Sequence, residues 1–324
     1  MDMYSLFMHP PILFFILGIF ASICKSNLDT PEQIKQFISI YLLMAIGLKA
    51  GYELSEAGLS INILYLFAFC VAFSIIVTVI AYFILQFKEN KADSALISAC
   101  YGSVSIVTFL SAIGFLETNQ IAFDGYITTA LGLMEAPPIL ISLLIYNIVS
   151  KKTNKNENKS WVKSALKNSL LEQSVLMLLG SIIIGYLCGL DGKEELKPFV
   201  GDIFKGMLSI YLLGMGVKAG KEMPKLLSSS KNLIIFAIIT PCITGTLGML
   251  SSVYIFHLNA GNCLLITMLF GSASYVAVPT SMQTSIPESN VGMAVTMTLL
   301  ITFILNIIIL MPIYYQIIVY LLHQ

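Results

Sequence analysis

Apolar residues occur in long runs along this 324-residue chain, and short polar stretches separate the runs. A helix of about 20 apolar residues is long enough to cross the hydrocarbon core of a bilayer. The pattern predicts an all-α membrane protein with ten transmembrane helices. The runs lie at 10–24, 34–51, 61–86, 95–116 and 124–149 in the first half, and at 169–190, 200–218, 231–256, 262–283 and 291–321 in the second.

Two internal sequence repeats, called echoes below, indicate that the chain is a duplication of one unit. Residues 40–54 return as residues 210–223, and Tyr101-Gly-Ser-Val-Ser105 returns as Phe270-Gly-Ser-Ala-Ser274. We therefore expect a first repeat at 1–150, a linker at 151–168 and a second repeat at 169–324. An odd number of spans in each half makes the second copy enter from the opposite face. Such inverted repeats are typical of secondary transporters.

Composition places the chain in lipid and excludes several partners. Hydrophobic residues make up 57% of the chain and charged residues 11%, whereas a soluble domain has about 25% charged residues. The net charge is zero, so nothing points to nucleic acid. All basic residues are lysines, which excludes bidentate guanidinium clamps on an anion. The cysteines show no ligand spacing, so we expect no transition-metal site and only Na⁺ as a bound metal ion.

The lysines predict the orientation of the spans. With the N-terminus outside, fourteen of the eighteen lysines fall in cytoplasmic loops, as the positive-inside rule requires. Both termini are then outside, and the linker is cytoplasmic.

Spans four and nine carry the candidate substrate site. Gly102 and Gly271 weaken their helices, and Pro279 removes a hydrogen-bond donor. A broken helix inside a membrane must be surrounded by protein or by a wet cavity, and its N-terminal end suits an anion. The alternative is that these small residues only allow close helix packing. The predicted substrate-binding residues are Gly102, Ser103, Ser105 and Thr108 on span four, and Gly271, Ser272 and Ser274 on span nine.

Span five carries the candidate cation site. Glu135 is a carboxylate placed well inside an apolar run, where it is costly unless paired, coordinated or protonated. Pro137 and Pro138 next to it free backbone carbonyls. Glu135, the carbonyls beside Pro137 and the hydroxyls of Ser105 and Ser274 form a plausible site for Na⁺ or H⁺. The alternative is a glutamate that lies at the helix end and reaches the membrane interface.

Several motifs resemble the sodium-dependent bicarbonate transporter family of bacteria. They are Gly47-Leu-x-x-Gly51, Gly102-x-Val-Ser105 with Thr108 and Glu117, Met134-Glu-Ala-Pro137 to Asn147, and Ser272-Ala-Ser274 to Asn290. The resemblance implies ten spans, with crossed broken helices four and nine. Spans one, two, six and seven would form a gate domain, and spans three to five and eight to ten a core domain. It also implies a homotrimer in the inner membrane, with Na⁺ as coupling ion and a PII-like cytosolic regulator.

The leading hypothesis is a secondary active transporter that moves bicarbonate or a similar small anion with Na⁺ by alternating access. One alternative is the same fold transporting a different organic anion or another solute, because Ile106 and Val107 make span four less polar than the family pattern. An alternative of another class is a membrane receptor or scaffold that binds a ligand without moving it. No catalytic constellation is visible, so we do not expect an enzyme.

Overall fold

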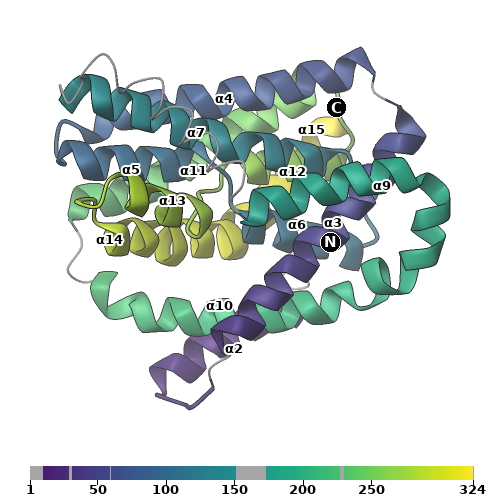
Figure 1. Cartoon of the computed structure of the whole chain (residues 1–324), viewed down its shortest axis with the longest axis horizontal. Coiled ribbons are helices and arrows are strands. Elements are labelled where there is room, and N and C mark those ends of the chain that lie inside the picture. The colour runs from purple at the N-terminus through teal and green to yellow at the C-terminus, as the bar shows by residue number, and fades with distance from the viewer. Residues whose placement is uncertain (1–9, 29–30, 59, 151–172, 227–229, 324) are drawn as a thin grey trace.

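A computed structural model describes residues 10–28, 31–58, 60–150, 173–226 and 230–323 (Figure 1). The predicted linker at 151–168 and the first four residues of the sixth predicted span lie outside the described residues. Every regular element in the described part is helical. This confirms the all-α class.

Each predicted span overlaps one helix or a run of consecutive helices in the described residues. In the first half these are α2 (Pro10–Ile23), α3 (Glu32–Ala57), α4 (Ile61–Leu85), α5 (Lys91–Gly102), α6 (Ile106–Thr118) and α7 (Ile127–Ser150). In the second half they are α9 (Gln173–Lys197), η1 (Pro198–Asp202), α10 (Phe204–Leu226), α11 (Lys231–Tyr254), α12 (Ala260–Phe270) and α13 (Ala277–Ser285). A last helical run combines α14 (Val291–Val295), the π-helical η2 (Thr296–Phe303) and η3 (Asn306–Leu310), and α15 (Met311–Leu322).

Seven helical stretches in the described residues are long and apolar enough to cross a membrane. They are Gln33–Glu56, Ile61–Gln86, Lys91–Thr118, Ile127–Ser150, Leu176–Asp202, Lys231–Tyr254 and Val291–Leu322. Two shorter helices, Pro10–Ile23 and Ala260–Phe270, are also apolar. The chain is therefore an all-helical membrane protein by length and composition, and the count of ten spans stays a prediction.

Polar caps fix where several of these helices begin. The side chains of Ser60, Asn90 and Asn259 accept hydrogen bonds from backbone N–H groups three residues on, in α4, α5 and α12. Ser105 and Asn290 do the same for α6 and α14. Such caps satisfy N–H groups that have no acceptor within the helix.

Glycines allow two helix pairs to pack backbone against backbone. A Cβ atom built on Gly185 of α9 would lie 3.1 Å from the Cα of Gly51 in α3. One built on Gly216 of α10 would lie 3.1 Å from the Cα of Gly18 in α2. The two crossings lie in the right and lower parts of Figure 1. Gly51 and Gly216 belong to the first echo, whose glycines recur four residues apart, so that echo is a helix-packing motif.

Helix α9 bends at a position where the backbone conformation favours glycine. Gly189, near the end of α9, has a φ of 54°, which is in the left-handed region that glycine adopts without steric cost. The sixth span was predicted to end at residue 190, one residue after this kink. The charged residues of α9, such as Lys193, follow the bend.

The helices that carry the predicted site lie at the centre of the molecule. In the stretch Lys91–Thr118, which contains α5 and α6, 94% of the most apolar window is buried. Residues 261–270 of α12 are all buried as well. By contrast, α4, α9 and α11 expose large apolar side chains such as Ile80, Leu187 and Ile243. These outer helices separate the centre from the surroundings.

Candidate functional site

Two helix breaks lie against each other at the centre of the molecule. One break is the non-helical segment 103–105 between α5 and α6, and the other is the segment 271–276 between α12 and α13. The backbone N–H of Ser105 donates to Ser272 Oγ at 2.9 Å. The backbone N–H of Ser274 donates to the carbonyl oxygen of Cys100 at 2.8 Å. Because Ser105 and Ser274 hold matching positions in the second echo, each half of the chain donates a backbone hydrogen bond to the other.

The position of Pro279 corrects one expectation. We predicted that this proline interrupts the ninth span, but it lies in the first turn of α13, which begins at Ala277. In the first turn a backbone N–H has no acceptor within the helix, so a proline there costs no hydrogen bond. The interruption lies earlier, in segment 271–276, and Pro279 stands where the helix has resumed.

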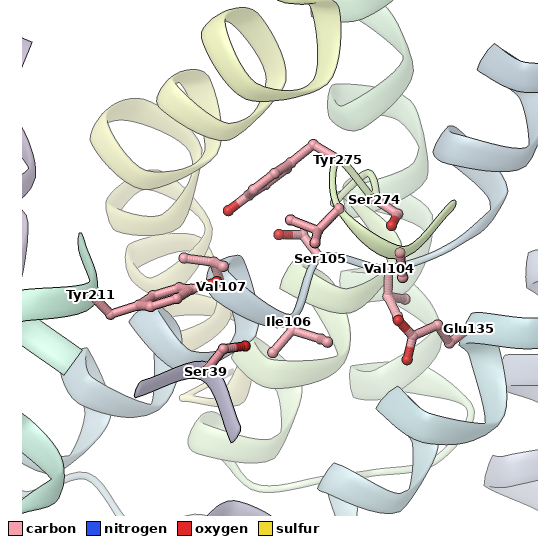
Figure 2. Close-up of a pocket in the computed structure, with 11 residues that line it drawn as sticks. Ser39, Val104, Ser105, Ile106, Val107, Glu135, Tyr211, Ser274 and Tyr275 are labelled. Atoms are coloured by element: carbon pink, nitrogen blue, oxygen red, sulfur yellow. The ribbon is translucent and has the colours of Figure 1, made fainter. Parts of the chain in front are cut away.

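A small cavity with about 30 Å³ of space for water-sized molecules opens beside the two breaks (Figure 2). Its wall consists of residues 104–107 from the first break and residues 274–277 from the second, with Glu135 from α7, Ser39 from α3 and Tyr211 from α10. A cavity needs about 10–15 Å³ by this measure to hold one water molecule, so this one has room for only a very small solute. Figure 2 shows Glu135 reaching the cavity from one side and Tyr211 and Ser39 from the opposite side.

Glu135 brings a carboxyl group into this buried place. Its side chain is 1% exposed, and it is the ninth residue of the 24-residue helix α7. This position excludes the alternative of a glutamate at a helix end. Ser103 Oγ donates to the backbone oxygen of Glu135 at 3.4 Å, which ties the first break to this turn of α7. Burying a charged carboxylate costs several kcal/mol unless a partner or a cation compensates.

Two helix N-termini meet the cavity from the side of the breaks. Ser105 is the N-cap of α6, and its Oγ accepts a hydrogen bond from Thr108 N at 3.1 Å. The next residues, Ile106 and Val107, line the cavity, and N–H groups at these first helical positions have no acceptor within the helix. Ala277, the first residue of α13, lines it too. Helix N-termini carry a partial positive charge, so this part of the wall favours negative charge.

Comparison with known proteins assigns the family. A family model described as the Na⁺-dependent bicarbonate transporter superfamily matches residues 10–319. The chain belongs to this superfamily. The match covers nearly the whole chain and confirms the resemblance predicted from the motifs. No curated protein matches the chain. Membership makes the chain a multi-pass membrane protein of a transporter family and not an enzyme.

In this superfamily member, three of the predicted site residues line the cavity: Ser105, Ser274 and Glu135. Pro137 does not line the cavity. Helix α7 continues through Pro137 and Pro138 as one helix. Because a proline has no N–H, the carbonyls of residues 133 and 134 lose their donors within the helix. These carbonyls lie within one turn of Glu135.

The other predicted residues hold the breaks in place. Gly102 packs on α4, where an added Cβ would lie 2.9 Å from the Ser74 carbonyl oxygen. Gly271 packs on α11, where an added Cβ would lie 3.2 Å from the Cα of Gly245. The remaining three, Ser103, Ser272 and Thr108, make the hydrogen bonds described above. None of these five residues lines the cavity.

Three polar residues that line the cavity were missed in the sequence: Ser39, Tyr211 and Tyr275. Tyr211 lies inside the first echo, and Tyr275 follows the second echo directly. Their positions relative to the echoes were a usable signal. Ser39 lies one residue before the first echo and shows no chemical pattern of its own.

Proposed function

We propose that this superfamily member is a secondary active transporter that moves bicarbonate or a similar small anion together with Na⁺ by alternating access. The observation that carries the proposal is one cavity in which a buried carboxylate, Glu135, meets hydroxyl groups and the N-terminal ends of α6 and α13. Such a wall offers ligands to a cation and to an anion at once. The superfamily's description as Na⁺-dependent bicarbonate transporters supports the same pair of ions.

The cation half of the site contains oxygen ligands. Glu135 supplies a carboxylate, Ser105 and Ser274 supply hydroxyls, and the turn before Pro137 supplies carbonyls that lack helical donors. These groups suit Na⁺ because a hard cation prefers oxygen. Bound Na⁺ would also offset the cost of burying the carboxylate.

The anion half contains hydrogen-bond donors and no basic side chain among the described lining residues. The N–H groups at the start of α6 and α13 would bind the anion, as at other helix N-termini. Five residues around the breaks would hold these helix ends in position: Gly102, Ser103, Thr108, Gly271 and Ser272. Two opposite charges in one poorly solvated cavity lower each other's electrostatic cost, and that mutual stabilisation is the coupling between the two ions.

The wider architecture belongs to the same proposal. We take α5–α6 and α12–α13 as the broken crossing spans four and nine of ten spans in two inverted repeats. The recurring order of helices in the two halves and the two sequence echoes support this arrangement. The packing of α2 on α10 and of α3 on α9 supports a gate domain of spans one, two, six and seven.

Further properties are supported by the lysine distribution or by the resemblance alone. The lysine distribution supports a cytoplasmic linker and external termini. A homotrimer, the bacterial inner membrane and a PII-like regulator are supported only by the resemblance.

A second candidate substrate is a small organic anion. The side chains of Val104, Ile106 and Val107 give part of the cavity an apolar wall, which would favour a solute with a methyl or methylene group. Competition of formate, acetate and propionate against labelled bicarbonate separates the two candidates. Stronger inhibition by the longer acids would favour the organic anion.

The test of the proposal is uptake into proteoliposomes. We expect uptake of labelled bicarbonate to depend on an inward Na⁺ gradient, and Glu135→Gln to reduce the Na⁺-dependent rate at least about tenfold, because a neutral amide binds Na⁺ more weakly. Glu56→Gln is the control, since that carboxylate pairs with Lys193 and its side chain is 39% exposed. Uptake that is indifferent to Na⁺ would refute the coupling, and equal losses in both variants would refute the role of Glu135.

A further inference from the structure

Tyr275 stands out among the residues that line the cavity. Its side chain is 3% exposed, and its hydroxyl makes no hydrogen bond to any residue in the described part of the chain. The hydroxyl of Ser105 lies beside it without the geometry of a hydrogen bond. The hydroxyl of a buried tyrosine usually has a hydrogen-bond partner. Because this hydroxyl has none among the described residues, a bound species could supply the missing partner.

The ring of Tyr275 lies at one edge of the group of residues that line the cavity. It packs edge to face on Phe303, with ring centroids 5.6 Å apart. Figure 2 shows the ring extending away from the second break, so that its hydroxyl faces the side from which Tyr211 enters. Glu135 lies on the other side of the cavity in the same view. The hydroxyl therefore lies away from the carboxylate and in the half that we assign to the anion.

Another buried tyrosine shows what a purely structural hydroxyl looks like in this protein. Tyr314 of α15 is 4% exposed, and its hydroxyl donates to the carbonyl oxygen of Cys242 at 2.9 Å. That hydrogen bond joins α15 to α11 within the protein. The Tyr275 hydroxyl makes no such bond within the described part of the chain and is fully buried beside the cavity, so packing explains its ring but not its hydroxyl.

We propose that the Tyr275 hydroxyl donates a hydrogen bond to the transported anion and so selects small oxyanions. This inference rests on the proposed function, because it assumes that the cavity binds an anion. A phenol donor is neutral and directional, and with no lysine among the described lining residues it supplies a donor without adding charge. An oxyanion accepts such a bond with a lone pair directed at the phenol. The carboxylate of Glu135 remains for the cation.

The experiment compares Tyr275→Phe with the control Tyr314→Phe in proteoliposomes under a fixed Na⁺ gradient. The anions are bicarbonate, formate, acetate and nitrate, each measured for KM and for the maximal rate. We expect Tyr275→Phe to raise the KM of the accepted oxyanion about tenfold or more, because a hydrogen bond to a charged group is lost. The Na⁺ concentration for half-maximal uptake should change less than about twofold.

A second measurement separates this role from a structural one. Removing a hydroxyl that has no partner should leave the melting temperature of the anion-free protein unchanged or slightly raised, whereas Tyr314→Phe should lower it and leave KM unchanged. Wild-type protein that moves none of the four anions would refute both the proposed function and this inference. Wild-type uptake with an unchanged anion KM in Tyr275→Phe would refute the inference alone. A shift confined to the Na⁺ dependence would also refute it, because the hydroxyl would then bind the cation.

Discussion

Replacing Gly185 by alanine tests whether direct backbone contact holds α9 to α3. Its added Cβ would lie 3.0 Å from the Cα of Leu48 and 3.1 Å from the Cα of Gly51. Both neighbours are backbone atoms, so no side chain can turn away to make room. Gly180 lies five residues earlier in the same helix, and a Cβ there would meet no atom within 4 Å. The two positions therefore form a matched pair for one substitution in one helix.

The expected magnitudes follow from these distances. Carbon atoms in contact lie about 3.5–4.0 Å apart, so Gly185→Ala must push the two helices apart by about 0.5–1 Å. Overpacking of this kind costs about 1–3 kcal/mol, and the better helix propensity of alanine returns about 0.5–1 kcal/mol. We expect a net loss of about 1–2 kcal/mol for Gly185→Ala. Gly180→Ala should gain up to about 1 kcal/mol, because only the propensity changes.

The assay is reversible unfolding of the purified protein in mixed micelles with increasing dodecyl sulfate, followed by circular dichroism. The wild type and the two variants are compared at equal protein and lipid concentrations. Opposite signs for the two variants would support backbone contact at Gly185. If Gly185→Ala were as stable as the wild type, or if Gly180→Ala lost as much stability, the proposed crossing of α3 and α9 would be wrong.

Two further substitutions test polar contacts away from the cavity, both measured by the same unfolding assay. Asp93→Ala should lower the free energy of unfolding by about 2–3 kcal/mol. Asp93 accepts hydrogen bonds from Asn90 Nδ2 and from the backbone N–H of Asn290, each at 2.6 Å, and their loss leaves both donors unpaired. A cost below about 0.5 kcal/mol would contradict this. Lys49→Ala should cost less than about 1 kcal/mol, because the 2.9 Å pair of Lys49 with Glu117 is partly exposed; a larger loss would show that the pair is a main contact.

The apolar pattern predicted two of the outer helices, α4 and α11, well because each is one long apolar run. The third span was predicted at 61–86 and is Ile61–Leu85, and the eighth was predicted at 231–256 and is Lys231–Tyr254. Ser60 caps the first of these with its hydroxyl. Such runs can be assigned as helices from the sequence alone, because an exposed apolar helix and its cap are both local properties of the sequence.

The interior was harder to predict because local sequence does not specify what a break packs against. Pro279 carries the strongest helix-breaking signal in its region, yet it lies in the first turn of a helix. The break comes earlier, where Ser274 N–H donates to the Cys100 carbonyl from the other half of the chain. A hydrogen bond between residues so distant in sequence replaces the one lost within the helix, and no window of sequence contains both residues.

The same limit applies to the cavity. Ser105, Ser274 and Glu135 could be predicted because each is a polar residue inside an apolar run, where its presence needs a reason. Ser39 and Tyr211 reach the cavity from α3 and α10. Only the arrangement of these helices around the breaks brings them there. Serine and tyrosine are ordinary residues at the positions that these two hold in their own helices.

The two echoes were informative for a physical reason that also explains why they do not give the substrate. Both mark places where the backbones of two segments come close: the glycine crossing at Gly51, and the hydrogen bonds from Ser105 N–H to Ser272 Oγ and from Ser274 N–H to the Cys100 carbonyl. At such places a different side chain would separate the two backbones, so both halves need the same small residues. Apart from Ser105 and Ser274, the residues that line the cavity are under no such constraint.

The cavity groups accordingly differ between the two halves of the chain. At the offset that relates Ser105 to Ser274, Tyr275 corresponds to Ile106, and Glu135 corresponds to Ile304. One half therefore supplies the carboxylate and the other half the phenol. If both halves carried the carboxylate, two negative charges would share one buried cavity and each would raise the cost of the other. A cavity that binds a cation and an anion together needs this asymmetry, because the two ions require ligands of opposite kind on opposite sides.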